Sequence, residues 1–134
     1  MRAVNEMREA ERNIRSGQVV DAAMRVHSRL GPGLLEGAYE ACLAHELRTR
    51  GLLVARQVQL PVEYDGAQIA LGYRIDLLID NVVVVEVKAV AKTTTLHEAQ
   101  VLSYLKLGGY PIGLLINFHV SHLKDGITRF VNDT

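Results

Sequence analysis

The stretch that most constrains the fold is Tyr73–Val90. It contains two apolar runs, Ile75–Ile79 and Val82–Val87, which are joined at Asp80-Asn81. The second run is rich in β-branched residues, which favour strands. Runs this apolar are typical of strands that are covered on both faces. The sequence therefore predicts a hairpin inside a sheet that carries a layer on each side.

Three ionisable residues, Asp76, Glu86 and Lys88, interrupt these apolar runs. Glu86 and Lys88 are two apart, so in a strand they share a face. A two-residue turn would send Asp76 and Glu86 to opposite faces, whereas a three-residue connection, Asp80–Val82, pairs Asp76 with Glu86. The second register leaves the other face entirely apolar, so we expect it, with the three charged residues on one face.

Two carboxylates that lie opposite each other repel unless a cation sits between them. Their oxygen ligands suit Mg²⁺, and Lys88 could orient or deprotonate a water or balance the charge of a phosphate. The pattern also fits a simpler arrangement, in which Asp76 begins a turn and Glu86 and Lys88 form a solvated pair. The spacing of these residues alone leaves both interpretations open.

Length and composition indicate an ordinary globular protein. The 134 residues are enough for one domain with a core, and we divide them into an N-terminal arm, residues 1–15, and a single domain, residues 16–134. Net charge is zero, so any surface for nucleic acid must be a local patch. With one cysteine, no apolar run long enough for a membrane and no secretion signal, a cytoplasmic location is expected.

Helical periodicity and end signals predict three helices. Their expected bounds are Gln18–Leu30 capped by Ser16, Leu35–Arg50, and Leu96–Leu107 with a capping box formed by Thr95 and Glu98. In the second of these, Cys42 is placed on the apolar stripe and is expected to face the core.

Strand signals predict, besides Val82–Lys88, four further segments. These are Val54–Tyr64, Ala67–Ile79, Ile112–Asn117 and a short edge strand at Ile127–Val131. An Asp65-Gly66 turn joins the first two. The order of elements predicts an α/β fold with a mixed central β-sheet flanked by helices.

Several polar residues are candidates for the surroundings of the site. Glu36 lies in the first turn of its helix, where the helix dipole favours an acidic residue. The alternative is that Glu36 is a further carboxylate directed at the metal. Gln100 and Tyr104 are four apart and share a helix face; they either border the site or are buried and satisfied by the backbone. Arg74 could contact a phosphate or neutralise the carboxylates, and His97 is a weaker candidate for a phosphate or metal-water contact.

A longer series of motifs runs in order along the chain. It comprises Gly33-Leu34-Leu35-Glu36-Gly37-Ala38-Tyr39, Arg56-Gln57-Val58, Tyr73-Arg74-Ile75-Asp76, Val85-Glu86-Val87-Lys88, His97-Glu98-Ala99-Gln100 through Leu105, Leu114–Phe118 and Leu123–Ile127. The series resembles the GxxExxY protein family, a branch of the PD-(D/E)XK nuclease superfamily. The resemblance covers about Val19 to Asn132.

The resemblance implies a restriction-endonuclease-like core with its active site at the hairpin. In that site Asp76 and Glu86 would ligate Mg²⁺, with the backbone carbonyl of Val87 nearby, and Lys88 would position the attacking water. Glu36 would take the place of a helix-borne acidic residue beside the metal. Gln100 and Tyr104 match a Gln-x-x-x-Tyr motif of phage lambda-type exonuclease relatives, where it supports the lysine and the substrate phosphate. The superfamily's proline before the aspartate is Ile75 here.

The function implied is a Mg²⁺-dependent nuclease, with Mn²⁺ as a substitute ion, that hydrolyses phosphodiester bonds of nucleic acid. DNA is expected before RNA, and a homodimer could combine two binding patches. The alternative is a non-catalytic nucleic-acid-binding or assembly module that keeps the fold. A third interpretation, hydrolysis of a small phosphorylated substrate, would require a closed pocket.

Overall fold

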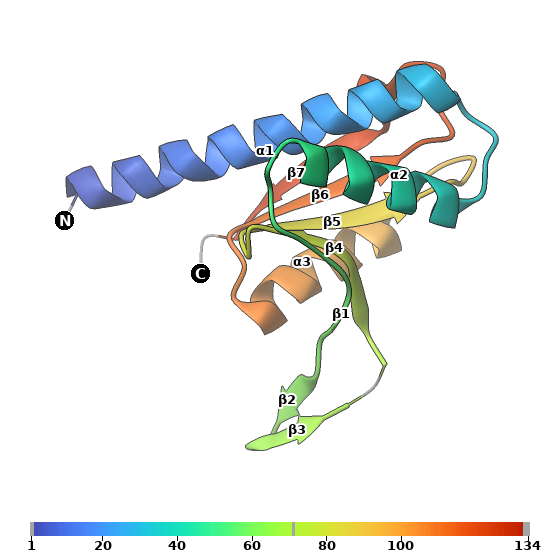
Figure 1. The fold of residues 1–134 in the computed structure, drawn as a ribbon. Helices are drawn as coiled ribbons and strands as arrows, with labels where there is room; N and C mark the ends of the chain where they lie inside the picture. The colour runs from blue at the N-terminus through green and yellow to red at the C-terminus, as the bar shows by residue number, and fades with distance from the viewer. Residues whose placement is uncertain (1, 71, 133–134) are drawn as a thin grey trace.

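A five-stranded mixed sheet forms the centre of the computed structural model, which describes residues 2–70 and 72–132 (Figure 1). The helices are α1 (Arg2–Leu30), α2 (Glu36–Thr49) and α3 (Thr95–Gly108), with a short 3₁₀ helix, η1 (Leu123–Gly126). The strands are β1 (Val54–Gln59), β2 (Val62–Tyr64), β3 (Ala67–Ile69), β4 (Arg74–Ile79), β5 (Val83–Lys88), β6 (Ile112–Asn117) and β7 (Ile127–Val131).

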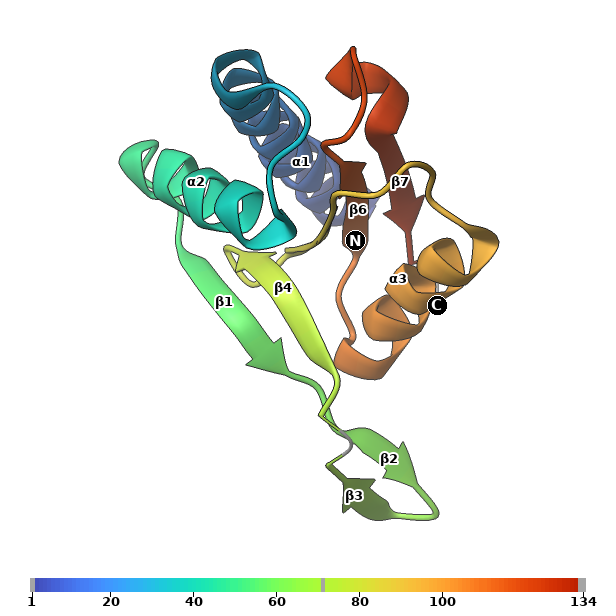
Figure 2. The same cartoon turned by 90° about the vertical axis from the view of Figure 1, so that its right-hand side faces the viewer.

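The sheet has the strand order β1-β4-β5-β6-β7, in which only β5 and β6 are parallel. Helices α1 and α2 cover one face and α3 covers the other (Figure 2). The larger core joins α1 and α2 to side chains such as Leu77 and Val85, and the smaller core joins α3 to Leu78 and Val84. The expected α/β fold with a mixed central sheet between helices is confirmed. Among the described residues, no helix combines the length and the apolar character that a bilayer crossing requires.

The expected register of the central hairpin is also confirmed. Ile79 pairs with Val83 and Leu77 pairs with Val85, so Asp80, Asn81 and Val82 form the connection. Asp80 and Asn81 both have positive φ angles, 50° and 59°, and short polar side chains tolerate that conformation best after glycine. The apolar face predicted from this register, including Val83, Val85 and Val87, lies in the core with α1 and α2.

The predicted cap at Ser16 is wrong, because α1 begins at Arg2 and continues through the expected boundary between residues 15 and 16. Ser16 is 5% exposed, and its hydroxyl donates to the carbonyl of Asn13 (3.2 Å). A serine inside a helix can satisfy its hydroxyl in this way, so it need not end the helix. The cap predicted for α3 is displaced by one residue: Thr94 caps the helix, and His97 takes the place expected for Glu98.

The segments Val54–Tyr64 and Ala67–Ile79 are not the continuous strands that the sequence predicted. The first is interrupted at Leu60-Pro61, where proline has no N–H for the ladder, and the second is interrupted before Tyr73, where Gly72 has a φ of 75°. The segments beyond these interruptions, β2 and β3, form a separate two-stranded sheet that projects away from the five-stranded sheet (Figures 1 and 2). The predicted Asp65-Gly66 turn joins them, with positive φ at both residues.

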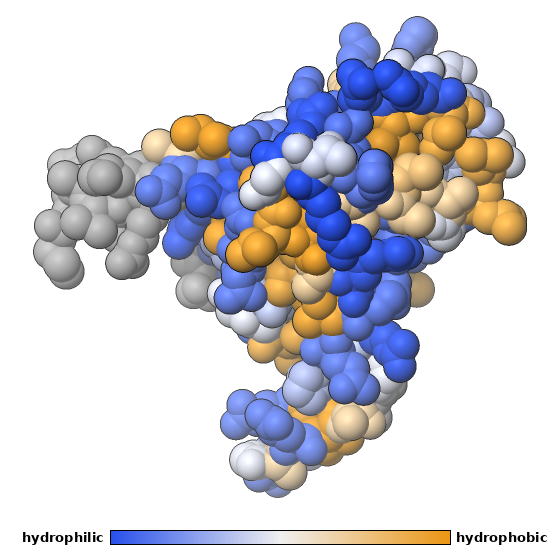
Figure 3. Space-filling model, in the orientation of Figure 1, coloured by the Kyte–Doolittle hydropathy of each residue, from blue (hydrophilic) through white to orange (hydrophobic). Residues whose placement is uncertain are grey.

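Cys42 is exposed rather than directed to the core. The buried side of α2 is formed by Tyr39, Glu40, Leu43, Ala44 and Leu47. Cys42 lies one residue before Leu43, about 100° around a helix of 3.6 residues per turn, and lines a hollow between α1 and α2 with Val26 and Leu30. Apolar side chains gather on this part of the surface (Figure 3).

Candidate active site at the splayed β4–β5 hairpin

The ladder between β4 and β5 stops where the charged residues begin. Its last pair is Leu77–Val85, and the same register places Asp76 opposite Glu86. Instead of ordinary ladder bonds, the Asp76 N–H donates to Glu86 Oε1 (3.3 Å) and the Val87 N–H donates to Asp76 Oδ2 (2.9 Å). Each carboxylate therefore accepts a backbone N–H from the strand opposite, which holds the two side chains close together.

Glu86 is buried, with 5% of its surface exposed. Burial and, to a smaller extent, the neighbouring negative charge of Asp76 together raise the pKa of its carboxyl to about 9, while Lys88 acts in the opposite direction. Burial of a carboxylate beside another carboxylate is costly unless a proton or a cation compensates it. The pair therefore has the electrostatic character of a cation site.

Lys88 is half-buried at the end of β5, where Asn117 in β6 is its strand partner. The Asn117 side chain forms two hydrogen bonds with the backbone of Val90, in the segment that follows β5. Its Oδ1 accepts the Val90 N–H (3.1 Å) and its Nδ2 donates to the Val90 carbonyl (2.9 Å). The Phe118 N–H donates to the Lys88 carbonyl (2.9 Å). The backbone that carries Lys88 is thus fixed by β6, a contribution that the sequence analysis did not identify.

Tyr104 in α3 lies near both carboxylates. Burial raises the pKa of its phenol, and the charges of Glu86 and Asp76 raise it further. The Tyr104 ring also contacts Tyr73, with ring centroids 6.3 Å apart. Gln100, one turn earlier, is half-buried on the same helix. His97 completes the capping box of Thr94, because its Nδ1 accepts the Thr94 N–H (3.1 Å). Arg74 is exposed at the start of β4.

The acidic side chain of α2 that is linked to this site by hydrogen bonds is Glu40. Its Oε2 accepts two hydrogen bonds from the Arg56 guanidinium (2.9 and 3.2 Å), and its Oε1 accepts one from Gln57 Nε2 (2.8 Å). The same Gln57 nitrogen donates to Asp76 Oδ1 (3.3 Å). Glu36 is half-buried, and within residues 2–70 and 72–132 its side chain forms no hydrogen bond or ion pair. Its role beside the metal stays a prediction.

The position of Glu40 in the sequence is itself a signal that its side chain is buried. Glu40 lies three and seven residues before Leu43 and Leu47, which is the spacing of the buried stripe of α2. A carboxylate on that stripe must have partners when the helix packs. Its partners come from β1, which is distant in the sequence.

Tyr39 fixes the loop that precedes α2. Its hydroxyl donates to the Gly31 carbonyl (2.6 Å) and accepts the Leu34 N–H (3.0 Å), and its ring stacks on Phe118 with centroids 4.6 Å apart. A ring nitrogen of His119 lies 2.9 Å from the Leu34 carbonyl. The tyrosine of the Gly-x-x-Glu-x-x-Tyr motif therefore has a structural role: it ties the start of α2 to the end of β6.

Among the described residues, no three His, Cys, Asp or Glu side chains are grouped as a ready-made metal site. The two that are in contact, Asp76 and Glu86, fit a divalent ion of the Mg²⁺ type by their chemistry, since both are hard oxygen donors and the Glu86 carboxyl is buried beside the Asp76 carboxylate. Further ligands would have to come from backbone, water or substrate, which is usual for Mg²⁺.

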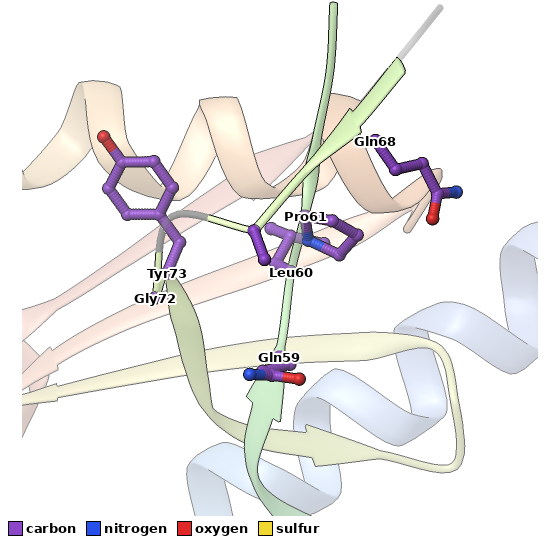
Figure 4. A pocket seen from close by; sticks show the side chains of 7 residues that line it. Gln59, Leu60, Pro61, Gln68, Gly72 and Tyr73 are labelled. Atoms are coloured by element: carbon purple, nitrogen blue, oxygen red, sulfur yellow. The ribbon is translucent and has the colours of Figure 1, made fainter. Parts of the chain in front are cut away.

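A hollow of about 250 Å³ opens at the base of the β2–β3 hairpin (Figure 4). In the close-up, Tyr73 lies on one side of Leu60 and Pro61, and Gln68 lies on the other. Tyr73 connects this hollow to the site, because its ring contacts Tyr104.

Comparison with known proteins gives one match. The model of the PD-(D/E)XK nuclease superfamily matches residues 13–130, which is most of the chain. No curated protein and no solved structure matches it. The five-stranded mixed sheet with helices on both faces is consistent with the restriction-endonuclease-like fold. The chain therefore belongs to the PD-(D/E)XK nuclease superfamily.

Proposed function

We propose that this protein is a metal-dependent nuclease that hydrolyses phosphodiester bonds of nucleic acid, DNA before RNA. We also propose that it belongs to the GxxExxY branch of its superfamily. The observation that carries the proposal is the contact between Asp76 and the buried Glu86, with Lys88 two residues further along the same strand. Superfamily membership supports a nuclease-type activity in general.

Asp76 and Glu86 would hold the ion, Mg²⁺ or in its place Mn²⁺, and the Val87 carbonyl and Glu36 are the further predicted ligands. When bound, the ion would supply a Lewis acid and lower the pKa of a water molecule. Lys88 would orient the nucleophilic water and balance negative charge on the phosphate as the bond to the leaving oxygen breaks. Tyr104 and Gln100 would border the same phosphate from α3.

An exposed aromatic ring in contact with Tyr104 supports a nucleic acid substrate. Tyr73 is 42% exposed, and the charges of Glu86 and Asp76 act on its neighbour Tyr104 by raising the pKa of the Tyr104 phenol. A base next to the scissile phosphate could stack on Tyr73, which contributes binding energy without sequence preference. A neighbouring cation, Arg74, is also exposed and could contact the backbone.

The second candidate function is a non-catalytic binding or assembly module. The observation that favours it is the zero net charge, which provides no overall attraction for a polyanion. A homodimer would enlarge the binding surface by combining two patches, and light scattering on the purified protein measures this directly.

The decisive experiment is cleavage of labelled linear, circular and single-stranded DNA, and of RNA, with Mg²⁺ or Mn²⁺. Wild type is compared with Lys88→Ala, Asp76→Ala and the control Lys124→Ala, which removes an exposed lysine from η1. The nuclease proposal expects cleavage that requires the ion, Lys88 and Asp76 but not Lys124. Binding of nucleic acid with no metal-dependent cleavage of any substrate would support the binding module instead.

A further inference from the structure

Gln57 interrupts β1 at the level of the site. Its φ angle is 52°, in the left-handed region that residues other than glycine rarely adopt. Its neighbours remain in the ladder, since Arg56 pairs with Leu77 and Val58 pairs with Ile75. Gln57 therefore lies opposite Asp76 but does not pair with it. Strained backbone of this kind destabilises the fold and tends to occur at functional sites.

The left-handed turn changes where the Gln57 side chain points. Consecutive residues of a regular strand project to opposite faces. Here, however, Arg56 and Gln57 both donate to the same carboxylate, that of Glu40. The turn brings the Gln57 amide to the side of its strand where it meets both Glu40 and Asp76.

The chemistry of the neighbours fixes the orientation of the Gln57 amide. Both partners are carboxylate oxygens, at 2.8 Å for Glu40 Oε1 and 3.3 Å for Asp76 Oδ1, so the NH₂ group must face them. An NH₂ group has two hydrogens and can donate to both acceptors at once. Glu40 is in turn anchored by Arg56, and it is 7% exposed.

Asp76 consequently has one donor on each carboxylate oxygen. Oδ2 accepts the Val87 N–H (2.9 Å), and Oδ1 accepts the Gln57 amide. Two donors on two different oxygens fix both the direction and the rotation of the carboxylate plane. With the Gln57 amide removed, the Val87 N–H would be the one remaining donor to the Asp76 carboxylate among the hydrogen bonds described above.

We infer that Gln57 is a positioning residue, which holds the Asp76 carboxylate in the orientation that receives the metal ion. This inference rests on the proposed function and deepens it. Hydrogen-bond partners of metal-binding side chains typically change metal affinity or activity by 10–100-fold when they are removed. The strain at Gln57 is consistent with this role, because a residue with no role there could be a glycine without the strain.

The test uses two variants with opposite effects on the backbone. Gln57→Gly removes the amide and relieves the left-handed strain, whereas Gln57→Met removes the amide and keeps both the chain length and the strain. Gln18→Ala, an exposed glutamine of α1, is the control. The measurements are Mn²⁺ affinity by calorimetry, kcat and KM for DNA, thermal stability, and hydrogen exchange of the Val87 amide without metal.

We expect both variants to weaken Mn²⁺ binding by roughly 10–100-fold. We also expect kcat to fall while KM for DNA is unchanged, and Val87 amide exchange to become faster. Thermal stability should separate the two, with Gln57→Gly at least as stable as wild type. A purely structural role would instead make the losses follow stability, so that Gln57→Gly would retain function.

Wild-type Mn²⁺ affinity in Gln57→Gly, with unchanged Val87 exchange, would overturn the inference and leave the nuclease proposal standing. If the wild type binds no Mn²⁺ through Asp76, the proposed function fails. Val87 exchange then still decides whether Gln57 holds Asp76, because that measurement needs no metal, and an unchanged rate overturns it.

Discussion

The β4–β5 hairpin carries an aspartate near each end, and the two carboxylates have different neighbours. Asp80, at the turn, accepts the Leu53 N–H (2.8 Å) on one oxygen and Arg15 Nε (3.1 Å) on the other. Asp76, at the open end, accepts the Val87 N–H and the Gln57 amide, which carries no charge. The local hydrogen bonding is similar at both ends, but among the residues that the structure describes Asp80 forms an ion pair, with Arg15, and Asp76 forms none.

Under the proposed function, this difference separates a structural carboxylate, Asp80, from a metal-binding one, Asp76. At the turn, the charge of Asp80 is neutralised within the fold, so the group stabilises the protein without a ligand. At the open end, Asp76 meets the buried Glu86, so the fold brings two acids together without full compensation. Such an arrangement is expected where a bound cation completes the charge balance.

The largest expected effect is on catalysis. Asp76→Ala should lower kcat by roughly 10²–10³-fold or more, the scale seen when a group that stabilises a transition state is removed. Asp80→Ala should leave kcat within about twofold, on the scale of surface changes. Steady-state cleavage of labelled DNA measures both. Equal losses in the two variants would remove the distinction between the ends of the hairpin.

The effects of the same two variants on stability should have the opposite order, with the larger loss for Asp80→Ala. Asp80→Ala removes two hydrogen bonds, one of them to a charged group, and should lower the free energy of unfolding by about 1–3 kcal/mol. Asp76→Ala removes hydrogen bonds from uncharged donors, the Val87 N–H and the Gln57 amide, so its cost should be smaller. Urea unfolding of both variants at neutral pH tests this, and a larger cost for Asp76→Ala would contradict the assignment of roles.

The pH dependence of the free energy of unfolding tests the role of Glu86 at the open end of the hairpin. The pKa of Glu86 is about 9 in the fold against 4.5 as its ordinary value, so between these values the folded protein holds a proton that the unfolded chain has released. Stability from this group is complete below pH 4.5 and falls as pH rises toward 9, by up to about 1.4 kcal/mol per pH unit.

Glu86→Gln should flatten this dependence, which unfolding measured at several pH values detects. Metal binding requires the ionised carboxylate, so the affinity of the wild type for Mg²⁺ or Mn²⁺ should rise over the same pH range. An affinity that is independent of pH would show that Glu86 is already ionised in the metal-free protein.

The smallest expected effect is at the turn. Arg15→Ala removes the cation from Asp80 at a partly exposed site and should cost about 0.2–1 kcal/mol. The Leu53 bond to Asp80 remains. Thermal unfolding at low and high salt measures this, and the difference between wild type and variant should shrink with salt.

Much of the framework followed from local pattern. The alternation of apolar residues in Ile75–Ile79 and Val83–Val87 permits only one register that buries a continuous face, and this register sets Asp76 opposite Glu86. Lys88 lies two residues after Glu86 on β5. These predictions succeeded because period-two side-chain geometry is a local property of a strand.

Local pattern was insufficient where a residue's partner lies far along the chain. The resemblance indicated Glu36, whose role stays a prediction. It did not indicate Glu40, which is linked to Asp76 through the Gln57 amide, because Arg56 and Gln57 of β1 meet Glu40 only after the helix has packed. Ser16 resembles a cap, yet the helix continues through it.

Residue types and spacing thus determined the mixed sheet, the hairpin register and the acidic pair with its lysine, since all of these depend on which face a side chain occupies. Tertiary structure alone decided the left-handed turn at Gln57, the clamp of Asn117 on Val90 and the unequal charge balance of Asp76 and Asp80. Hydrogen bonds and charge compensation depend on distances between segments, and those distances are set only when helices and sheet pack together.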